Sequence, residues 1–437
     1  MQELLNDTIF ALSSGSPPAA IALVRISGPG AGGALAALAG SLSAPRRAVA
    51  ATLRDAAGEA LDRALVLWLP GPGTATGEDI AELHLHGGRA VVAAVEAALA
   101  ALPGLRRAAA GEFTRRAFAN GRIDLAEAEG LADLLSAETD LQRRSALAMA
   151  SGALSRVVED WRTRLLMLSA SVEAVLDFSD DDDGIALPAA FPPDCAALAD
   201  EMTQWLARPR AEVLREGFRV VLAGPPNAGK STLFNTLTQS EAAITAPTPG
   251  TTRDVITRSV ALDGLPFVFV DTAGLRETAD DPADEIGPVE RIGMDRARGV
   301  AAAADLVLWL GEGGEIPVGA PAWLIAAQID RTGRIVDPAA RHAVSALSGA
   351  GMSELRRALL AHARTALPAP GEAALGERQH RLLGQCCEGV AAAGGQPDPL
   401  LAAEHLRLAR VALDRLVGRS GTEDMLDTLF GRFCIGK

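Results

Sequence analysis

Apolar residues change their spacing several times along the chain, and each change indicates a different kind of element. Residues 21–28 (IALVRISG) and 64–71 (ALVLWLPG) form the short apolar runs of strands, whereas 91–102 (VVAAVEAALAAL) has helical character. From about residue 124 to 176, apolar positions recur at helical spacing. The pattern predicts a mixed α/β part followed by a helical part.

A second mixed pattern interrupts the helical part. Strand, loop and helix signals alternate over residues 214–368, and the Pro- and Gly-containing stretch 367–371 indicates a linker. Helical spacing then returns, and Ser420 with Glu423 has the pattern of a capping box. The predicted segments are an N-terminal α/β domain, a first helical part, an inserted α/β domain and a second helical part: 1–118, 119–213, 214–368 and 369–437.

Composition favours a soluble, cytoplasmic protein. The chain has 437 residues, 49% of them hydrophobic, and a net charge of −14. This sign of charge gives no general attraction for a polyanion, so contact with nucleic acid needs a local patch or a partner. No signal peptide is visible, and the apolar stretch 300–310 is too short to span a bilayer. The cysteines lack CxxC spacing and suit reduced thiols: Cys195, Cys386, Cys387 and Cys434.

Two groups of potential metal ligands have plainer interpretations. Asp180 to Asp183 follow the long helical stretch, and such a run favours a solvated loop over a metal site. Glu82, His84 and His86 alternate along AELHLHGG, so in a strand they share one face. Such a trio could hold a metal, but no further ligand is indicated, and a pocket-lining or exposed face is favoured.

The strongest motif is a phosphate-binding loop. An apolar strand at 218–223 (FRVVLA) runs into 224–231 (GPPNAGKS), and TLFNTL continues as a helix, so GxxxxGKS lies in its required context. Glycines let backbone N–H groups close around phosphate oxygens, and the helix N-terminus adds positive potential. Lys230 can reach the β and γ phosphates, and the Ser231 hydroxyl can ligate Mg²⁺.

Further nucleotide-binding elements follow at suitable distances. Thr252 lies in a hydroxyl-containing loop, 249–254, and can complete the Mg²⁺ shell. The strand at 265–270 ends in a DxxG element, 271–274, whose Asp holds Mg²⁺ through water and whose Gly amide senses the γ phosphate. The segment 344–347 (VSAL) is similar to the last guanine-contacting turn. Together these elements predict a GTPase of the Ras-like class.

Two positions depart from that pattern. Leu275 follows the DxxG element and cannot orient the attacking water as a Gln does, so another side chain must assist hydrolysis. The guanine-reading element, normally Asn-Lys-x-Asp, is AQID at 327–330. Asp330 can still accept hydrogen bonds from guanine, but Ala327 cannot brace the base, which predicts GTP binding weaker by roughly 1–3 kcal/mol. A decayed site that binds no nucleotide is the alternative, and the intact phosphate loop argues against it.

Several motifs resemble one family along the whole chain, the tRNA modification GTPases MnmE, also called TrmE. The longest is GEFTRRAFANGRIDL at 111–125, and the most distinctive is the terminal FCIGK. The others are DTI from Asp7, RISG from Arg25, TGED from Thr76, LHGG from Leu85, GTTRD from Gly250 and DTAGLR from Asp271.

This resemblance implies both a fold and an activity. It implies an α/β folate-binding and dimerisation domain, a helical domain, and a Ras-like P-loop GTPase domain inserted into the helical one. The implied function is GTP-driven modification of the tRNA wobble uridine, U34, which adds an aminomethyl or carboxymethylaminomethyl group at C5. The one-carbon unit would come from 5,10-methylene- or 5-formyl-tetrahydrofolate. The flavoprotein MnmG would join the homodimer as a heterotetramer.

The resemblance also implies roles for individual nucleotide-site residues. Glu290, in VERIG, would orient the attacking water, with Glu285 as the less favoured alternative. Mg²⁺ would be held by Ser231 and Thr252. K⁺ would lie beside the phosphates on Asn227, Ala246, Thr248 and Thr251. The predicted nucleotide contacts are Asn227, Ala228, Gly229, Lys230, Ser231, Thr232, Ala246, Thr248, Gly250, Thr251, Thr252, Asp271, Thr272, Ala273, Gly274, Asp330, Ser345, Ala346 and Leu347.

The implied folate contacts are Arg25, Glu82, Arg122 and the terminal Lys437. An Arg can pair with folate carboxylates, and a Glu can accept hydrogen bonds from the pterin amide and amino groups. Cys434 fits a prenyl signal poorly, since Gly and Lys occupy the last two positions. In the family the tail enters the folate site, and two roles for Cys434 stay open there: a nucleophilic or redox thiol, and an inert buried thiol.

Two other functions are alternatives. A regulatory GTPase switch, for example in ribosome assembly, would share the GTPase core but lack the N-terminal domain and the FCIGK tail. Such proteins usually carry a basic RNA-binding module, which this acidic chain does not show. A folate-dependent transferase with an incidental nucleotide site is the third interpretation. Folate binding by the N-terminal domain separates these two from each other.

Overall fold

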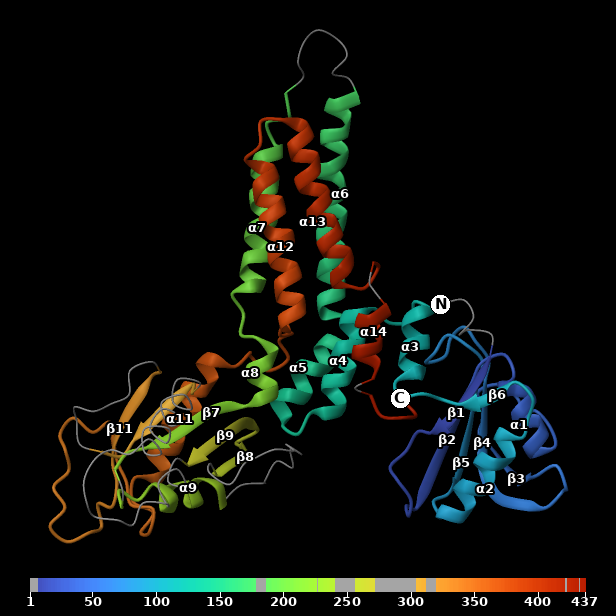
Figure 1. The fold of residues 1–437 in the computed structure, drawn as a ribbon, viewed down its shortest axis with the longest axis horizontal. Coiled ribbons are helices and arrows are strands. Elements are labelled where there is room, and N and C mark those ends of the chain that lie inside the picture. Colours follow the sequence, from blue (N-terminus) through green and yellow to red (C-terminus); the bar gives the residue numbers. More distant parts are fainter. Residues whose placement is uncertain are drawn as a thin grey trace, which may run out of the picture. The chain divides into compact units, whose positions relative to one another are not determined.

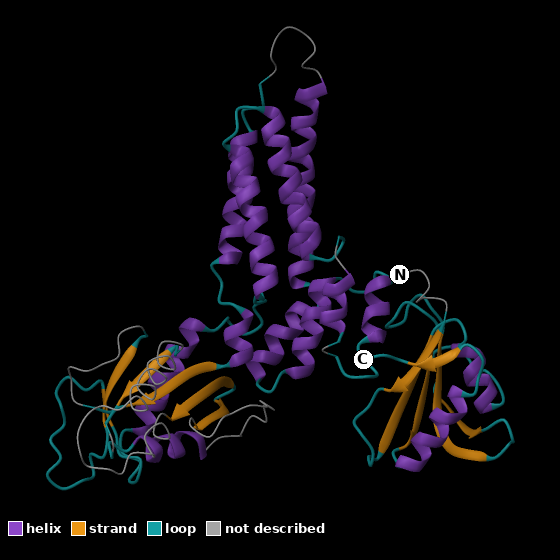
Figure 2. Cartoon of the chain, in the orientation of Figure 1, coloured by secondary structure: helices purple, strands orange, loops and turns teal. Residues whose placement is uncertain are grey.

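The chain divides into two compact units. One contains residues 1–132, 155–165 and 410–437, and the other contains 133–154 and 166–409. The computed structural model describes residues 7–177, 186–225, 227–239, 256–271, 304–311, 320–420, 423–431 and 433–437, without the side chains of 423–425. Each unit contains one sheet, drawn in orange in Figure 2, and the helices are drawn in purple. The protein is therefore a multidomain α/β and all-α protein, as the sequence predicts.

The first unit is built on a six-stranded sheet with the order β3-β4-β5-β2-β1-β6. Its neighbours are antiparallel except β1 and β6, which are parallel. Helices α1 (Ala31–Ala39) and α2 (Arg89–Ala100) lie beside this sheet (Figure 1), and their apolar side chains share one core with it. The strands are β1 (Thr8–Leu12), β2 (Ile21–Ser27), β3 (Val49–Arg54), β4 (Ala60–Leu69), β5 (Ile80–His86) and β6 (Leu105–Arg107).

Strand alternation gives the two faces of this sheet different chemistry. Val24 and Leu83 are buried in the core formed with α1 and α2. Their neighbours Arg25 and Glu82 therefore point to the other face, because successive side chains of a strand alternate. On that second face Phe113 packs with apolar residues of β1, while the polar side chains stay half-buried.

The C-terminal residues fold onto the same unit. Helix α14 (Glu423–Phe430) and Phe433 pack against α3 (Glu112–Ala119) and the start of α4 (Leu125–Ser136). Gly111 allows this approach, since its φ is +68° and an added Cβ would lie 2.2 Å from the Phe430 carbonyl oxygen. A side chain at this position would push the last helix away.

Long helices make up much of the second unit. The predicted helical stretch 124–176 is interrupted twice, by the capping box of Thr139 and Gln142 and by Gly152 with φ +76°. Helix α7 packs along α12, so helices from before and after the inserted α/β part meet. The helices are α5 (Asp140–Ala150), α6 (Ala153–Asp177), α7 (Phe191–Leu206), α8 (Ala211–Glu216), α12 (Glu377–Gly394) and α13 (Pro399–Leu416), of which α6 and α13 contribute residues to both units.

The second sheet has the order β12-β11-β10-β7-β9-β8. Only β8 is antiparallel to its neighbour, so the carboxyl ends of β7, β9, β10 and β11 share one edge. Apolar side chains of α9 (Lys230–Gln239) and α11 (Met352–Ala366) share one core with the sheet. In sheets of this kind, ligands bind beyond the carboxyl edge. The strands are β7 (Phe218–Ala223), β8 (Ile256–Leu262), β9 (Leu265–Asp271), β10 (Leu306–Trp309), β11 (Ala322–Ala326) and β12 (His342–Ala343).

Two further expectations can be compared with the fold. No helix in the described part of the chain is both long and apolar enough to cross a bilayer. The predicted capping box of Ser420 and Glu423 lies partly outside the described side chains, although α14 does begin at Glu423.

Candidate functional site

The phosphate loop connects β7 to α9 at the carboxyl edge of the second sheet. Gly224 and Gly229 have φ values of +142° and +91°, and Asn227 has +61°. Glycine adopts such angles without strain, so the loop can turn its amide groups inward before the helix begins at Lys230. The Lys230 ammonium donates to the carbonyl oxygens of Gly224 and Pro225 at 3.0 and 2.8 Å. Its charge is thus held over the loop that the sequence predicts to bind phosphate.

The predicted Mg²⁺ ligands lie partly in the described structure. Asp271 ends β9, is 1% exposed, and pairs in register with Leu222 of β7 two residues before the phosphate loop. Ser231 is the second residue of α9 and is exposed. Carboxylate and hydroxyl oxygens suit Mg²⁺, so these two residues fit the ion chemically. Thr252 lies outside the described residues.

A cavity of about 300 Å³ lies beside the phosphate loop and brings together three separate segments. Its walls include Gly229 and Thr232 at the start of α9, Asp330 from the loop after β11, and Val344, Ala346 and Leu347. Ser345 is fully buried, and its hydroxyl accepts from the Ser348 amide at 3.0 Å, which fixes that turn. The cavity therefore joins the predicted guanine-contacting residues to the phosphate loop.

A contact beside this cavity was not anticipated from the sequence. Ala327 is 4% exposed and carries no polar group, as expected. The next residue, Gln328, donates from its amide nitrogen to the Asn227 carbonyl oxygen at 3.1 Å. The guanine loop is therefore tied to the phosphate loop from a neighbouring position. The sequence signal for this contact was Gln328 itself, which stands where the Asn-Lys-x-Asp motif normally has Lys.

Several predicted residues lie outside the described part of the chain. For the K⁺ site, only Asn227 is described. The Asp180–Asp183 run, Leu275 and both candidate water-orienting residues, Glu285 and Glu290, are also outside it. The remaining ones are Ala246, Thr248, Gly250, Thr251, Thr252, Thr272, Ala273 and Gly274.

The predicted folate residues lie in the first unit, and two of them pair with each other. Arg25 of β2 and Glu82 of β5 are opposite in register, and the guanidinium Nη2 donates to the Glu82 Oε1 atom at 3.0 Å. Arg25 also lies over the Phe113 ring, 5.8 Å from its centre. Both side chains remain partly accessible, at 23% and 17% exposed. The pair is therefore reachable by a ligand that can replace one partner.

The neighbouring histidines do not form a metal cluster with Glu82. His84 lies 3.6 Å from the second Glu82 oxygen, whereas the His86 ring bonds Asp62 of β4 at 2.7 Å. Within the described ranges, no group of three or more His, Cys, Asp or Glu side chains is placed to hold a metal. Arg122 lies over Gly77, and no hydrogen bond or ion pair in the described part joins it to Arg25, Glu82 or Lys437.

The C-terminal tail is held beside β1. The Ser13 hydroxyl donates to the Gly436 carbonyl oxygen at 2.8 Å, and Ile435 forms an antiparallel bridge with Ala110. Gly436 has φ +96°, and an added Cβ would lie 2.0 Å from the Leu12 carbonyl oxygen. Of the two roles left open for Cys434, the inert buried thiol is wrong about burial, because Cys434 is exposed. The tail thus ends one strand away from the strand that carries Arg25.

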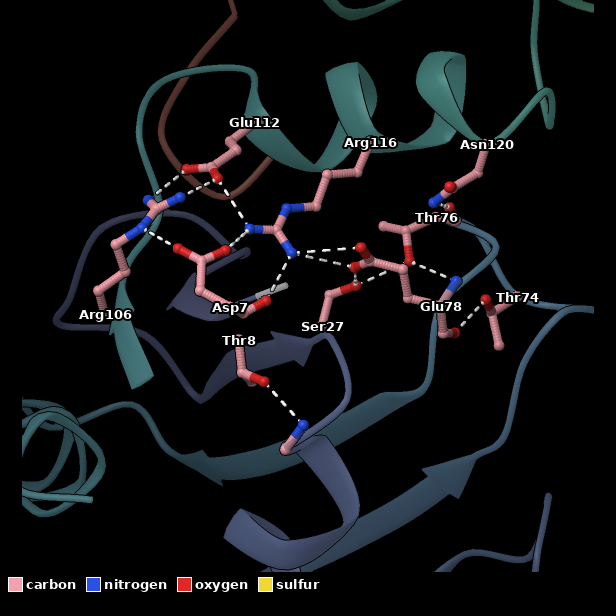
Figure 3. Close-up of polar contacts among 11 residues, drawn as sticks. Asp7, Thr8, Ser27, Thr74, Thr76, Glu78, Arg106, Glu112, Arg116 and Asn120 are labelled. Carbon is pink, nitrogen blue, oxygen red and sulfur yellow. Dashed lines mark hydrogen bonds and ion pairs between the residues drawn. The ribbon is translucent and has the colours of Figure 1, made fainter. Parts of the chain in front are cut away.

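An ion-pair network joins three of the N-terminal motifs (Figure 3). Arg116 of α3 is 3% exposed and pairs with Glu112 at 3.0 Å and with Glu78 at 3.2 Å. Both Arg116 and Arg106 also pair with Asp7. Buried charges of this kind are stable only with partners, so the network fastens α3 and the loop before β5 to the start of β1.

The network shifts the titration of Glu112. Burial alone raises the pKa of Glu112, but hydrogen bonds from Arg106, from the Ala109 amide and from Arg116 outweigh it, so the pKa lies below its ordinary value. A carboxyl with a depressed folded-state pKa adds stability above its unfolded pKa, and this stability is lost as the pH falls through the folded pKa.

Two family models together match most of the chain, and both are models of the same family. The family model "MnmE helical domain" matches residues 125–434, and the model "GTP-binding protein TrmE N-terminus" matches residues 8–122. A "tRNA modification GTPase MnmE" from Novosphingobium aromaticivorans is 65% identical, over 99% of this chain and 100% of that protein. One from Erythrobacter litoralis is 59% identical, over 99% and 100%. Among solved structures, the G domain of the T. maritima FeoB iron transporter is 24% identical with a TM-score of 0.25, covering 33% of this chain and 98% of that chain.

Replacing Glu112 by Gln tests the ion-pair network. The variant should lower the opening free energy of β1 and α3 by roughly 3–5 kcal/mol at pH 7, the cost of breaking a buried pair. The difference from the unchanged protein should begin to shrink below about pH 4.5, the ordinary pKa of a Glu, and should vanish only once the pH has fallen through the lowered pKa of the native carboxyl. Hydrogen exchange of the β1 and α3 peptides, compared at each pH, measures it. Glu59→Gln, at an exposed site, is the control; a difference that does not depend on pH would contradict the assignment.

Replacing Gly436 by Ala tests the docking of the tail. The added methyl group would collide with the Leu12 carbonyl, so amide exchange in the peptides that contain residues 12–13 and 433–437 should accelerate about tenfold or more, equivalent to ~1.4 kcal/mol. Gly58→Ala is the matched control, because its φ of +82° is similar but nothing lies within 4 Å of the added carbon. Equal exchange in the two variants would show that the tail is not held by this contact.

Proposed function

The chain belongs to the tRNA modification GTPase MnmE family and is a GTP hydrolase that acts in tRNA modification, and from this premise we propose its chemistry. It modifies C5 of the wobble uridine U34 with an aminomethyl-type group, carboxymethylaminomethyl or aminomethyl. The one-carbon unit comes from a tetrahydrofolate, and the flavoprotein MnmG is the partner. The observation that carries the proposal is the presence, in one chain, of a phosphate loop with an adjoining cavity and of a separate sheet with the C-terminal tail docked at the end of its strand β1.

The nucleotide half of the proposal rests on the cavity beside the phosphate loop. Asp330 lines it and offers two carboxylate oxygens, which can accept from guanine N1–H and the N2 amino group. Adenine cannot satisfy both. Ala346 and Leu347 also line the cavity, and Ser345 holds the turn between them and Ser348. The site therefore favours GTP over ATP although the motif lacks its Asn.

Hydrolysis needs charge stabilisation and an oriented water. Ser231 and Thr252 would hold Mg²⁺, with Asp271 acting through a water, and the ion would supply positive charge to the β and γ phosphate oxygens. Asn227, with Ala246, Thr248 and Thr251, would hold K⁺, which adds charge where other GTPases use an arginine. Lys230 already lies over the loop and can contact the same oxygens. Glu290 then supplies the water-orienting group that Leu275 lacks.

The one-carbon half rests on the second face of the N-terminal sheet. Arg25 can exchange its Glu82 partner for a folate carboxylate, which leaves Glu82 to accept from the pterin. Arg122 and the terminal Lys437 add positive charge for a dianionic cofactor. Cys434 is exposed near the end of the docked tail, where a thiol can reach a bound one-carbon unit. We further propose that the protein acts as a homodimer that joins MnmG in a heterotetramer.

Reconstitution tests the proposed function directly. The purified chain, MnmG, tRNA, GTP, Mg²⁺, K⁺, reduced nicotinamide, FAD and methylene-tetrahydrofolate should yield a C5-modified U34, identified by mass spectrometry of digested nucleosides. Omission of folate or of GTP should each abolish the product. A product that forms at an undiminished rate without folate would contradict the one-carbon source, and absence of any U34 product would contradict the proposal as a whole.

Replacing Glu290 by Ala tests its proposed role. The affinity for GTP should stay unchanged, since the side chain is not needed to hold the nucleotide, while turnover should fall by ~10²-fold or more. Fluorescent-nucleotide binding and phosphate release measure the two quantities. Glu285→Ala serves as the control and should retain turnover. Unchanged hydrolysis in the Glu290 variant would refute the assignment.

A further inference from the structure

The guanine loop, residues 327–331, carries an unusual side-chain contact. Gln328 lies in the left-handed region with φ +61°, and its amide nitrogen donates to the Asn227 carbonyl oxygen at 3.1 Å. The side chain also lies over Gly229, where an added Cβ would come within 3.1 Å of the same nitrogen. Gln328 therefore spans from the loop after β11 to the loop after β7.

A second residue fixes which end of the Gln328 amide points to the phosphate loop. Arg331 donates from its guanidinium to Gln328 Oε1 at 3.4 Å, and its backbone amide donates to the Gln328 carbonyl at 3.1 Å. An Arg can only donate, and the Asn227 carbonyl can only accept. The amide thus has one orientation, with its oxygen toward Arg331 and its nitrogen toward Asn227.

We propose that Gln328 is the positioning residue that couples the guanine loop to the phosphate loop, in place of the Asn that position 327 lacks. This inference rests on the proposed guanine pocket and goes beyond it. Asp330 lies inside the turn that the Arg331 amide closes, so Gln328 sets the distance between the base-reading carboxylate and the phosphate-binding amides. Nucleotides that occupy both subsites, GDP and GTP, gain from this fixed spacing.

The contact predicts separate roles for Asp330 and Gln328. Asp330 chooses the base, because its oxygens meet guanine. The amide nitrogen of Gln328 already donates to the Asn227 carbonyl oxygen, so it does not take part in choosing the base. Loss of Gln328 should therefore weaken every nucleoside diphosphate and triphosphate by a similar factor and leave the preference for guanine over adenine intact.

The test compares variants of the full-length protein with fluorescent GDP and with unlabelled GTP and ATP as competitors. Gln328→Met keeps the size of the side chain but removes the donor, and Gln328→Asn keeps the amide but shortens its reach. Both should raise the dissociation constant for GDP about three- to tenfold, the effect of one net hydrogen bond, mainly through faster dissociation. The ratio of GTP to ATP affinity should change less than about twofold. Arg331→Met should show a smaller loss of the same kind.

Two further variants make the outcome decisive. Arg334→Met, an exposed Arg in the following loop, is the control and should bind like the unchanged protein. Asp330→Ala should remove the preference for GTP over ATP. GDP binding by both Gln328 variants within twofold of the control overturns the coupling role, and so does a Gln328 variant that loses base preference. A preference that survives Asp330→Ala, or absence of nucleotide binding by the unchanged protein, overturns the guanine pocket itself.

Discussion

The docking of residues 433–437 against the end of β1 is the contact on which the rest of the fold depends. Ser13 holds the Gly436 carbonyl, and Gly436 fits against Leu12 only because it has no side chain. The two ends of the chain therefore belong to one unit, and everything between residues 166 and 409 leaves that unit and returns to it. The nucleotide-binding sheet is thus an insertion by topology. The same contact puts the carboxyl terminus at the end of β1, the strand next to the one that carries the partly accessible Arg25.

Some charged side chains of this acidic protein stabilise the fold, whereas others stay accessible to a ligand. Arg116 pairs with Glu112 and with Asp7 in a mostly buried network, so the motifs that contain them hold the N-terminal unit together. Arg25 and Glu82 belong to the same set of motifs but remain partly exposed. Lys230 is held over its own loop by carbonyl oxygens. A residue in a shared motif can therefore serve folding or ligand binding, and its partners decide which.

The sequence could predict elements whose signals are local. The phosphate loop followed from its glycines between a strand and a helix, and β2, β4 and α2 followed from apolar spacing. The long helical stretch was predicted without its breaks, although the Thr139 capping box and Gly152 were readable signals. Partner choice between distant segments could not be predicted. The Arg25–Glu82 pair depends on strand register, and the Gln328 contact depends on how two loops meet at one sheet edge.

The central claim is that the carboxyl end of the chain completes a folate site on the N-terminal sheet while the inserted unit binds the nucleotide. Calorimetric titration of 5-formyl-tetrahydrofolate into the full chain and into a chain that lacks residues 434–437 tests it most directly. The account predicts that truncation weakens folate binding at least about tenfold, ~1.4 kcal/mol, with unchanged affinity for GDP. Equal folate affinity in the two chains would contradict the account.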